Sequence, residues 1–459
     1  MEITQIRGRG RDIAELAAVA GFYAFLTIVM TYPLSLRMTS HLAFGRGDPL
    51  LNVWILTWGW NHLGQLFDGY FHGNIFYPHP YTVAYSEHLL ASVLLGFPVY
   101  IATRNPVLTY NFIFLFSFVV SGIGMYLLTR RLTGSRTLGI LSGCIFSFCP
   151  FRFGHLGHLQ LLTTQWIPFT FLYLHTFFES RRLRHALLFT LFFLLEALSC
   201  GYYALFLALF VGFFVIYFLI SQASFKDRAI LTGLVLSAAI SAMVLVPLYY
   251  QYAQVRQTMG FHRSLTELSF FSADITGYLS APTFNRFWGR ALLPFSKPEG
   301  QLFFGLTPML CFLCLVILRP RRQPATTGNF SFLPPRALLA ALRVMVVIAI
   351  ASVILIKLTG GFTITAGAAK LDAHHLRNPI FIATGLAALL FLVDVRSRAK
   401  ILTFLRGTFS FQREVQFYLL LLALAVLFSF GPAIRLNGHA LAPGPYEILY
   451  RYFPGFDNL

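Results

Sequence analysis

Acidic residues are rare in this chain, so an acid in a loop is a candidate for chemistry. Only 17 of the 459 residues are Asp or Glu, and Asp48 lies in the loop sequence Gly-Arg-Gly-Asp-Pro at residues 45–49. A carboxylate at a bilayer surface can take a proton from an acceptor hydroxyl as a general base. The simpler interpretation is a helix cap, since Asp before Pro49 is typical of an N-cap followed by a helix-starting proline.

A second acid, Glu87, follows Ser86 and precedes an apolar segment at residues 89–103. Ser86 is suited to cap that segment as a helix, which would put Glu87 in the favourable first turn. The alternative is that Glu87 joins Asp48 as a second catalytic carboxylate. Both interpretations stay open at the level of sequence.

Two histidines stand three residues apart in the sequence RFGHLGHLQ at residues 152–160. His155 and His158 can share one face at this spacing, with Gln160 close by, and can bind a phosphate or other polar substrate group. A divalent metal would need at least one more ligand, which Asp48 or Glu87 could supply. The cofactor is therefore unknown, with a divalent metal as one option, and no residue is assigned to a metal.

Basic residues gather in two later segments, residues 250–301 and 357–378. Arg263 lies in the first, and His375 and Arg377 lie in the second. Guanidinium groups suit phosphate oxygens, so these residues are candidate substrate contacts. Anchoring to anionic lipid head groups is the simpler alternative.

The composition is that of a membrane protein, with 57% hydrophobic and 11% charged residues. Soluble domains have roughly 45–50% and about 25%. Apolar stretches long enough to cross a bilayer recur along the chain, and no period-2 pattern of an outer-membrane barrel is present. We expect an all-α transmembrane bundle of about eleven spans, at residues 13–34, 107–129, 137–150, 159–178, 186–200, 202–220, 229–249, 302–318, 337–356, 379–394 and 415–431.

The net charge of +18 is distributed between the spans. Of the 35 Lys and Arg residues, 20 fall in six short segments, at residues 7–11, 130–136, 181–184, 226–228, 319–336 and 396–413. This positive-inside bias predicts a cytoplasmic N-terminus and places the loops carrying Asp48, His155 and Arg263 on the opposite face. The charge therefore indicates contact with membrane lipids, and no nucleic-acid partner is expected.

Two helices are expected to lie along the membrane in the first outer loop, residues 35–105. Residues 50–66 carry Trp54, Trp58 and Trp60, which are typical of the membrane interface. Residues 89–103 are apolar but short, with Pro98 in the middle, and counting them as a span would invert every later loop.

Three parts are expected along the chain: a transmembrane module at residues 1–318, a cytoplasmic linker at 319–336 and C-terminal helices at 337–459. The linker is rich in Pro, Gly, Thr and Arg. The last residues, 443–459, read like a loop leading to another span, so the C-terminal part is expected to be truncated.

Together these features resemble the GT-C superfamily of membrane glycosyltransferases. The resemblance rests on the first outer loop with Asp48 and its juxtamembrane helices, the stretch GIGMYLLTRRLTGSR from Gly122, and the stretch PFRFGHLGHLQLLTTQWIP from Pro150. The last two stretches are similar to an uncharacterised bacterial branch that resembles protein mannosyltransferases.

The resemblance implies transfer of a sugar from a polyprenyl-phosphate donor to a lipid, glycan or protein acceptor, on the outer face of the bacterial inner membrane. It assigns Asp48 as general base or metal contact, and a basic residue of a later loop to the donor phosphate. Arg263 or Arg377 would take the latter role, with the other candidates shaping the site.

Two other functions are compatible with the sequence. One is a non-enzymatic lipid or glycan translocator, which would need a polar path to the cytoplasmic side, for example past His175. The other is a scaffold subunit of a cell-envelope complex. The sugar, the acceptor, the stereochemical outcome and the oligomeric state are left open.

Overall fold

A computed structural model describes residues 2–45, 47–260, 262–295, 300–310, 363–366, 369–372, 413–453 and 455–456. The chain divides into two compact units, of which the first holds residues 1–282, 295–305 and 417–459. Its longer helices are α1 (Glu2–Met30), α2 (Asp48–His62), α3 (Leu90–Thr103), α4 (Pro106–Thr133), α5 (Arg136–Ser147), α8 (Trp166–Ser180), α9 (Leu183–Ala197), α10 (Gly201–Ser221), α11 (Arg228–Met259) and α17 (Arg413–Ser429).

Short elements complete the first unit. They are the α-helices α6 (Pro150–Gly154), α7 (Leu159–Leu162), α12 (Leu265–Phe271) and α18 (Tyr446–Tyr452), the 3-10 turns η1 (Leu34–Leu36), η2 (Leu63–Gln65), η3 (Thr82–Tyr85) and η4 (Ile275–Leu279), and the strands β3 (Ala433–Leu436) and β4 (His439–Pro443). In the second unit, β1 (Thr363–Ala366) pairs antiparallel with β2 (Ala369–Asp372). The turn η5 (Leu293–Phe295) lies where the chain passes between the units.

Five helical segments of the described residues are long and apolar enough to cross a membrane. They are residues Asp12–Met30, Pro106–Thr133, Arg136–Gly154, Gly201–Ser221 and Arg228–Met259. The predicted mostly helical fold is confirmed, and the five candidate spans agree with the predicted membrane character, but the count of about eleven spans is not confirmed. The helices α8 and α9 have 15 residues each, or about 22 Å at 1.5 Å per residue, against a hydrocarbon core of roughly 30 Å. The predicted spans 337–356 and 379–394 lie outside the described residues.

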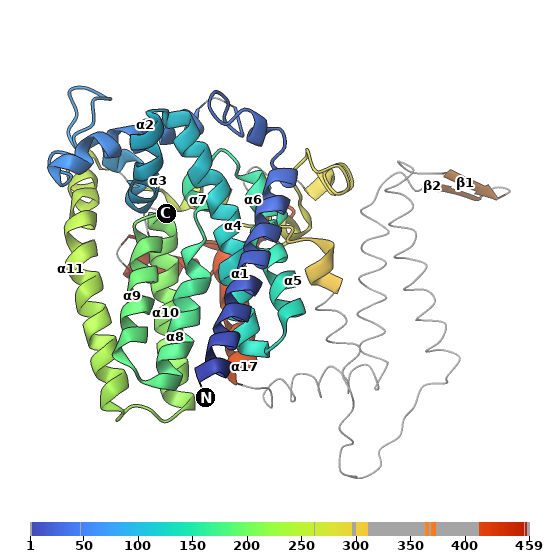
Figure 1. Ribbon diagram of the computed structural model, residues 1–459. Coiled ribbons are helices and arrows are strands. Elements are labelled where there is room, and N and C mark those ends of the chain that lie inside the picture. The colour runs from blue at the N-terminus through green and yellow to red at the C-terminus, as the bar shows by residue number, and fades with distance from the viewer. Residues whose placement is uncertain are drawn as a thin grey trace, which may run out of the picture. The chain divides into compact units, whose positions relative to one another are not determined.

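Figure 1 shows the N-terminus at one end of the helical bundle and α2 at the other. At the end near the N-terminus, arginines that flank the turn between α4 and α5 pair with acids: Arg130 and Arg136 with Glu15, and Arg131 with Glu179. Arg181 pairs there with Asp227, the cap of α11. The opposite end carries α2, α3 and the turns around α6 and α7.

The helix α4 holds the loop helices in place. Its N-cap, Asn105, accepts a hydrogen bond from the Leu108 amide at 2.9 Å, and Pro106 starts the helix. Ile55 of α2, Val93 of α3 and Phe114 of α4 are fully buried in one hydrophobic cluster. The loop helices are therefore packed onto the bundle.

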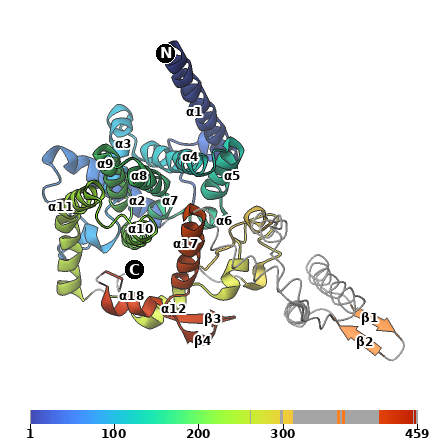
Figure 2. The same cartoon turned by 90° about the horizontal axis from the view of Figure 1, so that it is seen from below.

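The C-terminal residues 417–459 belong to the first unit. Phe417 of α17 is fully buried in a cluster with Phe214 and Phe218 of α10. Asp274 accepts hydrogen bonds from the amides of Gly438 at 2.7 Å and Asn437 at 3.1 Å, which holds the β3–β4 hairpin. Figure 2 shows this hairpin together with α12, α17 and α18. The predicted linker 319–336 lies outside the described residues.

Candidate functional site

A buried arginine fixes the turn that carries the two candidate histidines. Arg152 of α6 is 2% exposed, and its guanidinium donates hydrogen bonds to the hydroxyls of Ser117, Ser121 and Thr164 and to the Leu162 carbonyl, at 2.8 to 3.1 Å. The same guanidinium stacks on the ring of Phe118, 4.2 Å from its centroid. Because these partners come from α4 and from the segment after the turn, the turn is held rigidly against the bundle.

Within this turn the two histidines face each other, as their spacing predicts. The amide of His155 bonds to the Arg152 carbonyl at 3.2 Å, and the amide of His158 bonds to the His155 carbonyl at 2.9 Å. The two Nδ1 atoms consequently lie 3.2 Å apart.

Asp48 meets His158 across more than one hundred residues of chain. The Asp48 Oδ2 atom lies 2.8 Å from His158 Nε2, and the Asp48 side chain is 56% exposed. The prediction that Asp48 caps its helix is wrong: Gly47 takes the cap position with a φ of +102°, and Asp48 is the first residue of α2. A left-handed φ favours glycine, which leaves the Asp48 carboxylate free to pair with the histidine.

Protonation of the two rings follows from burial and geometry. Burial, aided by the positive charge that His158 can carry, lowers the pKa of His155 to about 4, so His155 is neutral at pH 7. A neutral His158 that donates from Nε2 to Asp48 must accept at Nδ1, which requires His155 to donate from Nδ1. A charged His158 would donate from both nitrogens. In either state one carboxylate oxygen of Asp48 is held by an N–H group.

Two further side chains border this group. Asn52 of α2 donates from Nδ2 to Gln160 Oε1 at 3.2 Å, which joins the Asp48 helix to the residues after His158. Tyr110 of α4 is 1% exposed, interacts electrostatically with Asp48, and has a hydroxyl without a hydrogen-bond partner among the described residues. The role of Gln160 as a substrate contact stays a prediction.

Asp48, His155 and His158 form a chain of contacts, with their donor atoms turned toward one another. Metal coordination needs lone pairs that converge on one point. No group of three or more His, Cys, Asp or Glu side chains with that arrangement is found in the part of the chain that the structure describes.

Glu87 lies at the start of another helix, α10. Its Oε2 atom accepts a hydrogen bond from the Gly201 amide at 2.7 Å. The prediction that Ser86 caps the following helix is wrong, since α3 begins at Leu90 without a side-chain cap. Burial raises the pKa of Glu87 to about 7 against the lowering effect of the α10 amides.

Arg263 lies near the start of α10, close to the Glu87 site, and has no contact with Asp48 among the described residues. It donates a hydrogen bond to Tyr202, the second residue of α10, which interacts electrostatically with Glu87. It also lies 3.7 Å from Glu267. No hydrogen bond or ion pair of the described residues joins Glu87 or Arg263 to Asp48. His375 and Arg377 lie outside the described residues.

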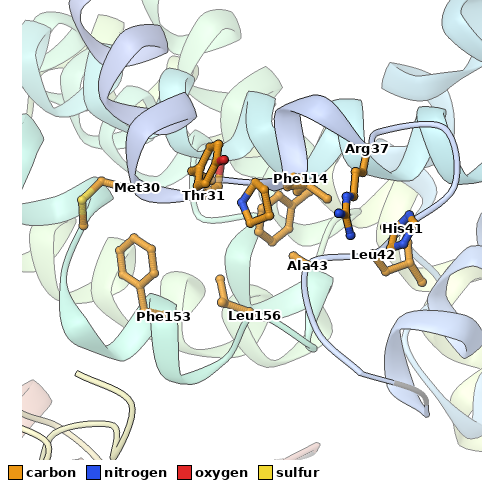
Figure 3. Close-up of a pocket in the computed structure, with 12 residues that line it drawn as sticks. Met30, Thr31, Arg37, His41, Leu42, Ala43, Phe114, Phe153 and Leu156 are labelled. Atoms are coloured by element: carbon orange, nitrogen blue, oxygen red, sulfur yellow. The ribbon is translucent and has the colours of Figure 1, made fainter. Parts of the chain in front are cut away.

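Sequence reasoning missed Arg152 as a positioning residue, and it missed Arg37 and His41, which line a pocket next to the histidine turn (Figure 3). A signal for Arg152 was available: an arginine between two predicted apolar spans requires partners. Arg37 follows the first span directly and has no acid near it in sequence.

Comparison with protein families matches residues 18–373 to a family described as a domain of unknown function (DUF6311). No curated protein and no solved structure matches the chain. Since the match includes all of α2 to α12, with Asp48, His155 and His158, the chain belongs to the DUF6311 family.

Proposed function

We propose that this DUF6311 protein is a membrane glycosyltransferase that moves a sugar from a polyprenyl-phosphate donor to a hydroxyl of a lipid, glycan or protein acceptor. The observation that carries the proposal is the contact of Asp48 with His158, backed by His155. In acid–base catalysis the base is usually oriented by a second group, which a third group holds in place. Here Asp48 would be the base, His158 the second group and His155 the third.

In the proposed reaction the free oxygen of the Asp48 carboxylate takes the acceptor proton while Oδ2 stays bonded to His158. The acceptor oxygen forms a bond to the anomeric carbon of the sugar. The bond from that carbon to the phosphate oxygen breaks, and its electron pair leaves with polyprenyl phosphate. Cationic or hydrogen-bonding groups must stabilise this leaving phosphate.

The proposed setting is the bacterial inner membrane, with the N-terminus in the cytoplasm. The support is the pairing of arginines with acids at the N-terminal end of the bundle, opposite the end that carries Asp48. Positive residues favour the cytoplasmic side.

A polar path past His175, the example given above for a translocator, has no support among the described residues. His175 is 2% exposed, and its Nε2 pairs with the Tyr418 hydroxyl at 3.1 Å. The rings of Phe214 and Phe218 pack edge-on against it, with centroids at 4.7 and 5.2 Å. This aromatic enclosure favours transfer over translocation.

The test compares Asp48→Asn with Asp68→Asn in purified protein given polyprenyl-phosphate sugars and membrane-lipid acceptors, with release of polyprenyl phosphate as the readout. Asparagine keeps an oxygen for the His158 bond but cannot take a proton, so we expect turnover to fall by about a hundredfold or more. Asp68 is an exposed acid of the same loop, and its variant should keep full turnover. Full turnover by Asp48→Asn would show that Asp48 is not the base.

A further inference from the structure

A pocket of about 210 Å³ lies at the end of α1, beside the histidine turn. Ligand sites for drug-sized molecules are typically about 300–1,000 Å³, so this pocket suits a head group. Leu156, which lies between His155 and His158 in the chain, forms part of its wall. The loop residues His41 to Ala43 form another part, a few residues before Asp48.

The lining has a basic side and an apolar side. Figure 3 shows Arg37 and His41 at one side of the pocket, and Met30 and Phe153 at the other. Phe114 and Leu156 lie between them. A ligand that satisfies both sides carries an anionic group and a hydrocarbon group.

Arg37 differs from four arginines at the opposite end of the bundle. Arg130, Arg131, Arg136 and Arg181 each pair with a carboxylate. Arg37 is exposed, and within the described residues its guanidinium has no ion-pair partner. His41 bonds through Nδ1 to its neighbour Ser40 at 2.9 Å, which leaves Nε2 for a ligand. A planar guanidinium beside an imidazole suits phosphate oxygens.

Two asparagines, Asn111 of α4 and its N-cap Asn105, hold the basic side in place. Asn111 is fully buried and donates from Nδ2 to the carbonyls of Met38 at 2.8 Å and His41 at 2.7 Å. Asn105 donates to the Thr39 carbonyl at 3.0 Å. The loop between Arg37 and His41 is thus fixed before any ligand binds, which lowers the entropy cost of binding.

The helix α1 ends at the pocket and has an exposed apolar face. Phe25, Ile28 and Val29 lie on this face, are 48 to 63% exposed and belong to the candidate span Asp12–Met30. Since head groups lie where spans end, a hydrocarbon chain can run along this face while its head group occupies the pocket.

We infer that the pocket between Arg37, His41 and Phe153 binds the phosphate of a membrane lipid, with the lipid chain along α1. The role of this site in the reaction rests on the transferase proposed above, in which the lipid is the sugar donor. Arg37 and His41 then hold the leaving phosphate within the same loop system that carries Asp48.

The test is the binding of farnesyl phosphate to purified protein in detergent, measured by titration calorimetry, with farnesol and inorganic phosphate as separate ligands. We expect farnesyl phosphate to bind far more tightly than either. Arg37→Gln should weaken it by about tenfold or more, because hydrogen bonds to charged groups are the strong ones. His41→Asn, which keeps the Ser40 contact, should weaken it less.

Arg104→Gln is the matched control, since Arg104 is an exposed arginine at the same end of the bundle and does not line the pocket. Equal affinity of Arg37→Gln and the unsubstituted protein would overturn the assignment. Inorganic phosphate binding as tightly as farnesyl phosphate would overturn the lipid part. Asp48→Asn should bind farnesyl phosphate normally, so failure of the transfer reaction and failure of the lipid site give different results.

Discussion

His155 is the residue whose protonation the fold controls most clearly in the site. It is 7% exposed, and its pKa of about 4 lies below the ordinary value of 6.5. Between these pH values the unfolded chain holds a proton that the folded chain lacks. Stability therefore rises with pH through this range, with a slope of up to about 1.4 kcal/mol per pH unit.

We predict that His155→Asn removes this part of the acid sensitivity. Asparagine can donate to His158 Nδ1 in the way His155 does, but it does not titrate. Melting temperatures in detergent, measured from pH 4.5 to 7, should rise less for the variant than for the unsubstituted protein. Parallel curves would mean that His155 is not buried as a neutral ring.

At the scale of elements, the start of α10 depends on a side chain from the loop before α3. Glu87 caps Gly201 from 114 residues away. We predict that Glu87→Ala costs about 1–3 kcal/mol, because an amide at the helix start loses its partner. Glu87→Gln keeps an acceptor oxygen and should melt close to the unsubstituted protein at pH 7.

The pH dependence separates these variants further. With a pKa of about 7 in place of 4.5, folded Glu87 holds a proton that the unfolded chain has lost between these values. Stability from this group falls as pH rises through that window, and Glu87→Gln should lack the fall. If Glu87→Gln instead folds normally but loses turnover, Glu87 is catalytic, as the sequence analysis proposed.

For the whole molecule, the separation of the two bundle ends predicts an orientation. Tyr77 is 95% exposed in the loop at the Asp48 end, and Lys226 is exposed in the turn between α10 and α11. With the N-terminus in the cytoplasm, an impermeant maleimide should label Tyr77→Cys in intact spheroplasts. It should label Lys226→Cys only after the membrane is disrupted.

Labelling of the unsubstituted protein is measured as the background from the five native cysteines; of these, Cys144, Cys149 and Cys200 are partly or fully buried, and Cys311 and Cys314 lie outside the described residues. The opposite labelling pattern would show the reverse orientation, and the prediction from the positive-inside bias would be wrong. If both sites were labelled in intact spheroplasts, they could not lie on opposite sides of the membrane.

Several helices could be predicted from the sequence, because their length and apolarity are compatible with a membrane-spanning helix alone. The helices α4, α10 and α11 each begin one residue before the predicted start. The spacing of His155 and His158 likewise determined that they share a face, because a local turn has few geometries. The helix α11 continues to Met259, ten residues beyond the prediction, because polar residues after Tyr250 remain helical outside the apolar stretch.

Contacts between residues far apart in the chain could not be predicted and are seen only in the folded structure. Asp48 reaches His158 because α4 packs against both the loop helices and the turn that Arg152 anchors. Glu87 reaches α10, where its carboxylate accepts a hydrogen bond from the Gly201 amide at the helix start. Hydrophobic length fixes where a span lies along the chain, but contacts between loops depend on how the spans pack, and a single sequence carries no direct measure of that packing.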